Sequence, residues 1–266
     1  MRKSALINVM ERAARKAARG LLHDLGEVEQ LQVSRKGPAD FVSKADVKAE
    51  QTIREELSRA RPDFGFIMEE GGRVDAPDGD SYWIVDPLDG TTNFLHGIPH
   101  FAISIGLVQK GDVQAGLVYA PVGDEMFFAE KGKGAFLNAK RLRASSRTKM
   151  ADALLATGIP YMGKPGHDTL RAELKALTDN VSGIRRFGVA SLDLAWVAAG
   201  RYDGFWERGL KQWDVAAGII LVREAGGLVT DIKGGRKMLE TGDILAANNS
   251  LHAPLLKALK SASASG

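Results

Sequence analysis

Cysteine is absent from this chain of 266 residues. Its absence excludes a disulfide framework, a cysteine-ligated zinc or iron–sulfur site and a thiol nucleophile. Long apolar runs are absent as well, because the densest one, residues 215–222, is far shorter than the roughly 18 residues that a membrane helix needs. We therefore expect a protein with no membrane partner, located in the cytoplasm.

Several motifs that would indicate a particular reaction are also missing. The chain has no G-x-x-x-x-G-K-[ST] phosphate loop and no G-x-S-x-G nucleophile turn. Gly132-Lys133-Gly134 lacks the third glycine and the following helix that a dinucleotide site requires. His96 and His100 are four residues apart, but Gly97 and Pro99 lie between them and no glutamate does, so we interpret both as loop or packing histidines.

The positive charge of the chain is concentrated at its start. Residues 1–20 contain six basic residues and one acid, which leaves 30 Lys or Arg against 32 Asp or Glu in the rest. Arg12, Arg15, Lys16 and Arg19 recur at helical spacing and fit a solvated helix face. A nucleic-acid groove usually also has aromatic residues along its basic face. A nucleic-acid or transcription partner is therefore an alternative that the sequence allows but does not support.

Length and composition favour a layered fold. The chain is long enough for one large domain or for two halves that share a core. Its 30 glycines favour an α/β or α+β domain over a helical bundle. Since we find neither an internal repeat nor a linker, we expect one domain over residues 1–266, with a first half of about residues 1–145 and a second half of about residues 146–260.

Apolar periodicity predicts the individual elements. It predicts a helix over residues 4–25, a loop at the polar residues 34–38, and a helix that starts at the capping box of residues 43–46 and ends near residue 60. Strands are predicted at residues 64–68, 82–85, 101–108, 113–119 and 125–129, the last three as an antiparallel meander. Further strands are predicted at residues 154–157, 202–206 and 244–247, and further helices at residues 169–177, 191–199 and 213–225. A last helix and a disordered Ser/Ala tail complete the chain.

Two acids follow one predicted strand in Tyr82-Trp83-Ile84-Val85-Asp86-Pro87-Leu88-Asp89-Gly90-Thr91. Pro87 is expected to stop the strand, and Gly90 permits a tight turn. If a helix begins at Gly90 or Thr91, its free N–H groups form an anion site beside the acids. Because acids repel an anion unless a cation lies between them, this block indicates a divalent metal that bridges protein and phosphate.

Two further acidic positions could complete such a site, and each has a simpler interpretation. Glu69-Glu70 follows the strand at residues 64–68 but, taken alone, fits an exposed turn. Asp214 precedes an apolar helix in Trp213-Asp214-Val215-Ala216-Ala217-Gly218 but, taken alone, fits an ordinary helix N-cap. Asp86 and Asp89 could also form a plain turn. That interpretation does not explain why a strand, a proline, a glycine and a hydroxyl residue occur together with the two acids in one block.

The nearest rival motif is D-x-D-G-T, which belongs to phosphatases that form an aspartyl phosphate. This chain has D-x-x-D-G-T instead. The extra residue would misplace Asp89 relative to Asp86 for that chemistry. We therefore favour direct attack by water.

Together these motifs resemble the signatures of the inositol monophosphatase family. The resemblance extends over about residues 34–249 and is carried by Glu69-Glu70, Asp86-Pro87-Leu88-Asp89-Gly90-Thr91 and Trp213-Asp214-Val215-Ala216-Ala217-Gly218. It includes Asp40-Phe41-Val42-Ser43-Lys44-Ala45-Asp46, Lys131-Gly132-Lys133-Gly134-Ala135-Phe136 and Ala246-Ala247-Asn248. Thr157-Gly158-Ile159-Pro160 and Arg185-Arg186-Phe187-Gly188 resemble details of its bacterial, extragenic-suppressor branch.

The resemblance implies a fold, a cofactor and an assembly. The fold would be a layered α/β (α+β) α-β-α-β-α sandwich of the sugar-phosphatase type, and the protein a Mg²⁺-dependent, lithium-sensitive homodimer with two or three ions per site. Glu69, Asp86 and the carbonyl of Leu88 would hold the first metal. Asp86, Asp89 and Asp214 would hold the second. Such an all-oxygen ligand set suits Mg²⁺ better than zinc or copper.

The resemblance also implies catalytic and substrate-binding residues. Thr91 would orient the attacking water, Asp46 would accept the hydroxyl proton of Thr91, and Glu69 would complete the catalytic group. Without the resemblance, Asp46 is only part of a capping box. The positions that match substrate contacts of the family are Asp89, Gly90, Thr91, Gly188, Ala190, Glu207 and Asp214.

The activity implied is Mg²⁺-dependent hydrolysis of inositol-1-phosphate and similar small phosphomonoesters, which would make the chain a phosphoric monoester hydrolase for a small phosphorylated polyol. Alternatives on the same fold are phosphatases for fructose 1,6-bisphosphate, histidinol phosphate or a nucleotide 3′-phosphate. An alternative of another class is a regulatory or nucleic-acid-associated protein without turnover. Such a protein would be expected to lose some of the acids, yet Glu69, Asp86, Asp89 and Asp214 are all present.

Overall fold

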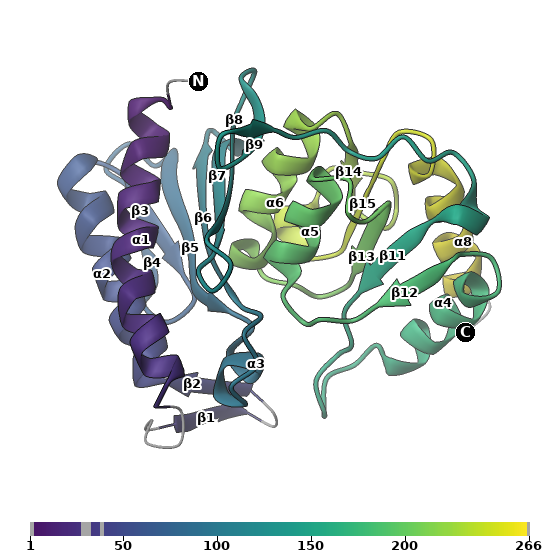
Figure 1. Ribbon diagram of the computed structural model, residues 1–266, viewed down its shortest axis with the longest axis horizontal. Helices are drawn as coiled ribbons and strands as arrows, with labels where there is room; N and C mark the ends of the chain where they lie inside the picture. Colours follow the sequence, from purple (N-terminus) through teal and green to yellow (C-terminus); the bar gives the residue numbers. More distant parts are fainter. Residues whose placement is uncertain (1–2, 28–32, 38–39, 265–266) are drawn as a thin grey trace.

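Five alternating layers of helix and sheet build the protein (Figure 1). A computed structural model describes residues 3–27, 33–37 and 40–264. Helices cover the outer face of one sheet, lie between the two sheets, and cover the outer face of the second sheet. The predicted α-β-α-β-α sandwich is therefore confirmed.

The larger sheet has eight strands in the order β10-β9-β8-β7-β6-β5-β3-β4. In chain order they are β3 (Gly65–Met68), β4 (Gly72–Val74), β5 (Ser81–Asp89), β6 (Ala102–Gln109), β7 (Asp112–Ala120), β8 (Glu125–Glu130), β9 (Gly134–Leu137) and β10 (Lys140–Arg141). β6, β7 and β8 form the predicted antiparallel meander, whereas β3 runs parallel to β5. Every residue of β5 is buried, so this strand lies within the core.

The end of β5 differs from the prediction, because the strand continues past Pro87 to Asp89. Its pairing with β6 is irregular between Asp86 and Asp89. On the other side, β3 pairs with β5 only as far as Val85. The missing N–H of Pro87 therefore interrupts no ladder with β3, and the irregularity carries both acids to the end of the strand.

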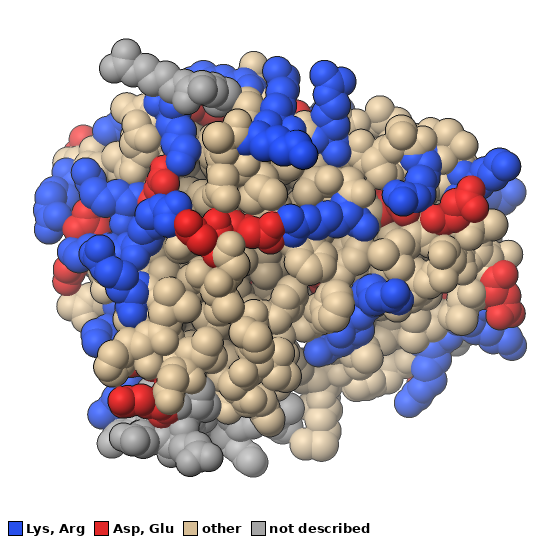
Figure 2. Space-filling view, viewed as in Figure 1, with Lys and Arg blue, Asp and Glu red and all other residues tan. Residues whose placement is uncertain are grey.

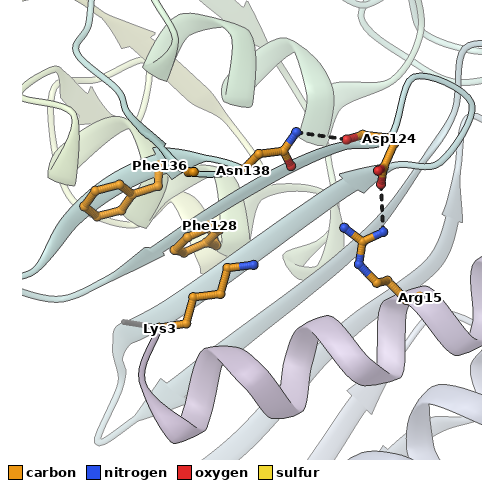
Figure 3. Close-up of a pocket in the computed structure, with 7 residues that line it drawn as sticks. Lys3, Arg15, Asp124, Phe128, Phe136 and Asn138 are labelled. Carbon is orange, nitrogen blue, oxygen red and sulfur yellow. Dashed lines mark hydrogen bonds and ion pairs between the residues drawn. The ribbon is translucent and has the colours of Figure 1, made fainter. Parts of the chain in front are cut away.

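The outer helices are α1 (Ala5–Leu25) and α2 (Lys44–Ala60), close to their predicted bounds. Ser4 caps α1 by accepting a hydrogen bond from the N–H of Ile7 at 3.2 Å. Lys and Arg side chains gather over α1 and α2 (Figure 2). Arg12 and Lys16 form ion pairs with Glu56 of α2, and their side chains stay 59% and 40% exposed, as predicted for a solvated face. Arg15 is also paired, with Asp124 at 2.7 Å (Figure 3).

The middle layer consists of α5 (Ala190–Ala198) and α6 (Gln212–Glu224), which are buried almost all round, as expected for helices between two sheets. α6 approaches the larger sheet along glycines. A Cβ atom at Gly106 would lie 2.8 Å from Cβ of Ala216, and one at Gly116 would lie 2.7 Å from Cα of Ala217. We call Gly106, Gly116, Ala216 and Ala217 the glycine seam. Its small side chains allow α6 to lie directly on the sheet.

The second sheet has the order β12-β11-β13-β15-β14 and is covered on its outer face by two helices (Figure 1). The strands are β11 (Leu154–Thr157), β12 (Gly183–Arg185), β13 (Gly204–Glu207), β14 (Leu228–Thr230) and β15 (Ile244–Ala247); the helices are α4 (His167–Thr178) and α8 (His252–Ala264), and the short α7 (Met238–Thr241) precedes β15. A buried polar contact joins α4 to β13: Glu173 accepts hydrogen bonds from Nε1 of Trp206 at 3.0 Å and Nε of Arg208 at 2.8 Å.

Two predictions at the ends of elements are wrong. Residues 34–38 were predicted as a loop, but β1 (Val33–Gly37) pairs with β2 (Asp40–Ser43) in antiparallel fashion. The polar sequence of this segment gives no sign of that pairing. The Ser/Ala tail was predicted to be disordered, but α8 continues to Ala264, anchored by the buried Leu255 and Leu259. Across the described ranges, no helix combines the length and apolarity needed to cross a membrane.

Candidate active site

Three buried or half-buried carboxylates meet where the larger sheet faces the middle layer. Asp86 and Asp89 come from the end of β5, and Asp214 from the first turn of α6. One oxygen from each of the three lies within 4.8 Å of the other two. The start of α6 is tied to the sheet, because Oγ of Ser104 in β6 donates a hydrogen bond to the carbonyl of Trp213 at 3.0 Å. The sheet thus fixes Asp214 opposite the two acids of β5.

Glu69 joins this cluster because it follows β3, which runs parallel to β5 and ends opposite Val85, one residue before Asp86. Its N–H donates to the carbonyl of Val85 at 3.2 Å. The next turn is held by the buried Glu50 of α2, whose carboxylate accepts the N–H groups of Glu70 at 2.8 Å and Gly71 at 2.6 Å. Glu50 was missed in the sequence, although it lies one helical turn after Asp46.

Burial raises the pKa of each carboxyl group in the cluster, and for Asp86 and Asp214 the charges of neighbouring acids add to it. Burial, followed by the charges of Glu69, Asp89 and Asp214, raises the pKa of Asp86 well above its ordinary value. Burial and the charge of Asp89 do the same for Asp214. Burial raises the pKa of Asp89 to about 6, although its carboxylate accepts the N–H of Ser191 at 2.7 Å. Crowded carboxylate oxygens of this kind fit a divalent cation that prefers oxygen ligands.

The structure corrects the interpretation of Asp214 as a helix N-cap. Lys211 occupies the N-cap position of α6, and Asp214 is the third residue of the helix. Its carboxylate does accept the N–H of Lys211 at 2.7 Å. The side chain therefore satisfies a helix-start N–H and faces the other acids at the same time.

A short turn and helix follow the acids, as the sequence predicts. Gly90 has φ 94°, and a Cβ atom there would lie 2.8 Å from Cγ2 of Val189, so both backbone conformation and packing require glycine. α3 (Thr91–Leu95) begins directly after it. The Thr91 hydroxyl lies 3.2 Å from Oδ1 of Asp46 and 3.1 Å from the carbonyl of Leu88, and can donate to either. Ser43, the first residue of the predicted capping box, has a side chain outside the described part of the structure.

The opposite wall contains the predicted residues Gly188, Ala190 and Glu207. Gly188 has φ 75° and precedes α5, which begins at Ala190. Glu207 ends β13, and burial followed by the charge of Asp89 raises its pKa to about 8, while Arg186 acts in the opposite direction. The structure therefore brings this wall within electrostatic range of the acid cluster.

Two residues near this wall were not singled out in the sequence. Asp193 of α5 is buried with its Oδ1 atom unpartnered, and burial together with the charges of Glu207 and Asp89 raises its pKa. Tyr161 lies in the loop after β11, within range of the charges of Asp89, Asp214 and Glu207. The sequence motif at residues 157–160 lies at the start of that loop. A sequence pattern does not show in which direction a side chain in a loop points.

The histidines lie outside the acid cluster, as interpreted. The ring of His100 packs against Phe187 and Trp196, with centroids 5.1 and 5.6 Å away. Burial lowers the pKa of His100. His96 follows α3, with a ring nitrogen 2.7 Å from the carbonyl of Thr92.

Comparison with known proteins gives consistent matches over the whole chain. The sequence matches the inositol monophosphatase family over residues 2–264. Inositol-1-monophosphatase of Mesorhizobium japonicum is 55% identical over 260 residues, 98% of each chain, and Nus factor SuhB of Pseudomonas aeruginosa is 44% identical over 259 residues, 96% of each chain. Among solved structures, extragenic suppressor protein suhB from Bartonella henselae has a TM-score of 0.94 and 56% identity, covering 97% of this chain and 99% of that one.

Proposed function

The chain belongs to the inositol monophosphatase family and is a phosphatase, and from this premise we propose that it hydrolyses inositol-1-phosphate and similar small phosphomonoesters to an alcohol and phosphate. The observation that carries the proposal is the set of three carboxylates, Asp86, Asp89 and Asp214, with oxygens within 4.8 Å of one another. The name of the relative from Mesorhizobium japonicum supports the choice of substrate.

The cofactor of the proposed reaction is Mg²⁺, with two or three ions per site. Glu69, Asp86 and the carbonyl of Leu88 would hold one ion, and Asp86, Asp89 and Asp214 another. Burial and the charges of neighbouring acids raise the pKa of Asp86 and Asp214, which supports this assignment, and so does the all-oxygen donor set. When bound, Mg²⁺ lowers the pKa of water and stabilises the leaving oxygen.

Thr91 and Asp46 form the proposed path for a proton. When the Thr91 hydroxyl donates to Asp46, at 3.2 Å, its oxygen lone pairs can accept a hydrogen bond from water and so orient it. As the water oxygen bonds to phosphorus, its proton passes to Thr91 and the proton of Thr91 passes to Asp46. The bond from phosphorus to the alcohol oxygen breaks, its electron pair stays on that oxygen, and the oxygen takes up a proton from solvent water. Glu69, beside Asp86, is the third residue of the proposed catalytic group.

Backbone and carboxylate groups would divide the recognition of the substrate. The amides of Gly90 and Thr91 would receive the phosphate. Gly188, where a Cβ atom would lie 2.5 Å from Nη1 of Arg186, would contact the ligand through its backbone. Asp89, Ala190, Glu207 and Asp214 would contact the hydroxyl groups.

A panel of substrates scored by phosphate release tests the proposal. Inositol-1-phosphate should give the highest kcat/KM in the presence of Mg²⁺, and dialysis against EDTA should abolish turnover until Mg²⁺ is restored. Full activity without a divalent metal would reject the metal assignment. A higher kcat/KM for fructose 1,6-bisphosphate, histidinol phosphate or a nucleotide 3′-phosphate would reject the substrate assignment.

A second copy of the chain is the proposed partner. Ile98 and Phe187 are 46% and 41% exposed, and Asn93 joins their loops by donating to the carbonyls of His100 and Phe187, both at 2.9 Å. Exposed apolar groups that lie together favour association. Phe187→Ser should shift the mass measured by light scattering from dimer to monomer. Val122→Ser, which changes an equally exposed valine elsewhere, should not; equal masses for both variants would reject this surface.

A transcription-associated role is the second candidate function, supported by the relative named Nus factor SuhB. The ion pairs of Arg12 and Lys16 with Glu56 weaken the case for α1 as a nucleic-acid surface. If α1 binds RNA, charge reversal at Arg12 should reduce binding and its salt dependence in a filter assay. Unchanged binding would place any such partner elsewhere on the molecule.

A further inference from the structure

Glu50 is a buried carboxylate that takes no part in the proposed reaction. It lies on α2, one helical turn after Asp46, and is 5% exposed. Moving a carboxylate out of water is costly unless hydrogen bonds replace its hydration. Here each oxygen accepts a backbone N–H, Oε2 that of Glu70 at 2.8 Å and Oε1 that of Gly71 at 2.6 Å. Glu50 therefore binds the turn between β3 and β4 at two points.

This turn begins with Glu69, the proposed ligand of the first metal, and Glu50 fixes the backbone on one side of it. A peptide plane contains the carbonyl of one residue and the N–H of the next, so the N–H of Glu70 shares a plane with the carbonyl of Glu69. The plane before Glu69 is held as well, because its N–H donates to the carbonyl of Val85 at 3.2 Å. With both planes held, the backbone dihedrals of Glu69 are set, and so is the direction in which its side chain leaves the backbone.

The place of the turn in the sheet explains why it needs support from a helix. The ladder between β3 and β5 ends at Val85, before the turn begins. On the other side the turn leads into β4, the edge strand, which has three residues, of which Gly72 and Arg73 are exposed. A strand this short forms few ladder hydrogen bonds. Glu50 instead ties the turn to the outer helical layer.

The packing at Gly71 fits this role. A Cβ atom there would lie 2.8 Å from Oε1 of Glu50 and 3.0 Å from Cε of Met68. The backbone of the turn thus approaches the carboxylate more closely than a side chain at this position would allow.

α2 places one acid at each of the two segments that carry the proposed catalytic group. Asp46 lies 3.2 Å from the hydroxyl of Thr91, after β5, and Glu50 holds the turn after β3. Because the two acids are four residues apart, they lie on the same face of the helix. A single rigid helix therefore sets the position of both segments.

We propose that Glu50 is a positioning residue for the metal site, which orients the Glu69 carboxylate toward the first ion by holding the N–H groups of Glu70 and Gly71. This inference rests on the proposed function, because it assigns a support to a ligand of the same metal site. Loss of a group that orients a metal ligand typically costs about ten- to a hundredfold in metal affinity or activity. Since Glu50 touches no reacting atom, its loss should change the metal requirement and leave kcat at saturating metal nearly unchanged.

Binding of Mn²⁺ without substrate, followed by electron paramagnetic resonance, measures this effect. Glu50→Gln keeps the shape of the side chain and one accepting oxygen, but presents an NH₂ group to the second N–H. It should raise the Kd for Mn²⁺ about tenfold or more. The Mg²⁺ concentration for half-maximal activity should rise by a similar factor, with kcat at saturating Mg²⁺ within about twofold of wild type.

Glu56→Gln is the matched control, because Glu56 is comparably buried on the same helix but pairs with Arg12 and Lys16 of α1. It should lose stability and keep its Mn²⁺ affinity. Gly71→Ala crowds Oε1 of Glu50 from the side of the turn, so it should weaken Mn²⁺ binding even if Glu50→Gln does not fold.

A double-mutant cycle shows whether Glu50 acts through Glu69. In a Glu69→Ala background, Glu50→Gln should change the Kd for Mn²⁺ by less than about twofold, because the ligand that it orients is gone. A full additional loss in this background would overturn the inference. So would unchanged Mn²⁺ affinity in folded Glu50→Gln, or in Gly71→Ala where Glu50→Gln does not fold, and so would an equal loss in Glu56→Gln.

The same measurements separate this inference from the proposed function. If Glu50→Gln weakens Mn²⁺ binding as expected but the wild-type chain does not hydrolyse inositol-1-phosphate, the proposed function fails and the role of Glu50 stands. If the wild-type chain hydrolyses inositol-1-phosphate but Glu50→Gln binds Mn²⁺ normally, the role of Glu50 fails alone. A wild-type chain that binds no Mn²⁺ would overturn both.

Discussion

The buried contact between α4 and β13 permits a quantitative test of what holds the second sheet to its outer helices. Glu173 has a side-chain exposure of only 1%, and its two oxygens accept from the indole N–H of Trp206 and from Arg208, which is 28% exposed. Glu173→Ala removes both acceptors at once. The indole N–H of Trp206 then stays buried without a partner, and the guanidinium of Arg208 is left with the more distant Asp243, at 3.6 Å, as a counter-charge.

The expected cost follows from these contacts. An unsatisfied buried donor costs about 1–3 kcal/mol, and breaking a buried ion pair by removing one partner costs about 3–5 kcal/mol in total. For a domain of this size, each kcal/mol lowers Tm by roughly 2–4 °C. Glu173→Ala should therefore lower Tm by about 6–20 °C. Glu173→Gln keeps one carbonyl acceptor and should fall between wild type and Glu173→Ala.

Thermal melting followed by circular dichroism measures the effect. Asp168→Ala is the matched control, because Asp168 forms an ion pair with Arg171 on the same helix, but with both side chains more than 70% exposed. Such an exposed pair contributes at most about 1 kcal/mol. If Glu173→Ala and Asp168→Ala melt within about 2 °C of each other, burial does not give the Glu173 contact its strength and the reasoning fails.

Three further outcomes are expected. Asp214→Asn should lower kcat at saturating Mg²⁺ by about 100-fold or more, because a charged ligand is lost. The metal-free variant should melt at the same temperature as wild type or higher, because like-charge repulsion is relieved. A near-normal kcat would rule out Asp214 as an essential ligand. Single-turnover hydrolysis in ¹⁸O-water should place the label in phosphate alone, and label in an aspartate of the protein would indicate a phospho-enzyme. The Lys16 and Arg59 side chains lower the pKa of Glu56, so Glu56 stabilises the fold above the ordinary carboxyl pKa and loses this effect as pH falls through its lowered value. In urea unfolding, Glu56→Gln should be less stable than wild type at pH 7 and approach it in acid; a difference that does not shrink in acid would contradict the ion pairs.

The parts of the site that the sequence predicted are those whose chemistry lies in one continuous segment. Asp86, Asp89, Gly90 and Thr91 follow a buried strand, and the strand, the turn and the helix start at Thr91 all leave local patterns. The order of the meander strands could be predicted for the same reason, because short turns join neighbouring antiparallel strands. Local patterns therefore account for the centre of the site and for the order of three of the eight strands in the larger sheet.

The remainder depends on neighbours that are distant in the sequence. Pro87 ends no strand, because the partner strand on its side has already ended. Glu50 acts on a turn about 20 residues later, and Tyr161 comes within range of Asp89 only when the two sheets enclose the middle layer. No periodicity records such contacts, since each depends on which elements share a layer rather than on the residues beside it.

The glycine seam has a consequence for how this protein tolerates change. At Gly106 and Gly116 any side chain would meet α6, and the first turn of that helix carries Asp214. A larger residue there would lift the helix, and a displacement of about 1 Å at a reacting centre can cost a hundredfold in rate. In a random-mutagenesis library selected for activity, these two positions should accordingly be as depleted of variation as the acids themselves, although neither glycine contacts the substrate. Substitutions that keep the protein active are thus restricted at the two glycines of the glycine seam, on β6 and β7, as well as at the residues of the acid cluster.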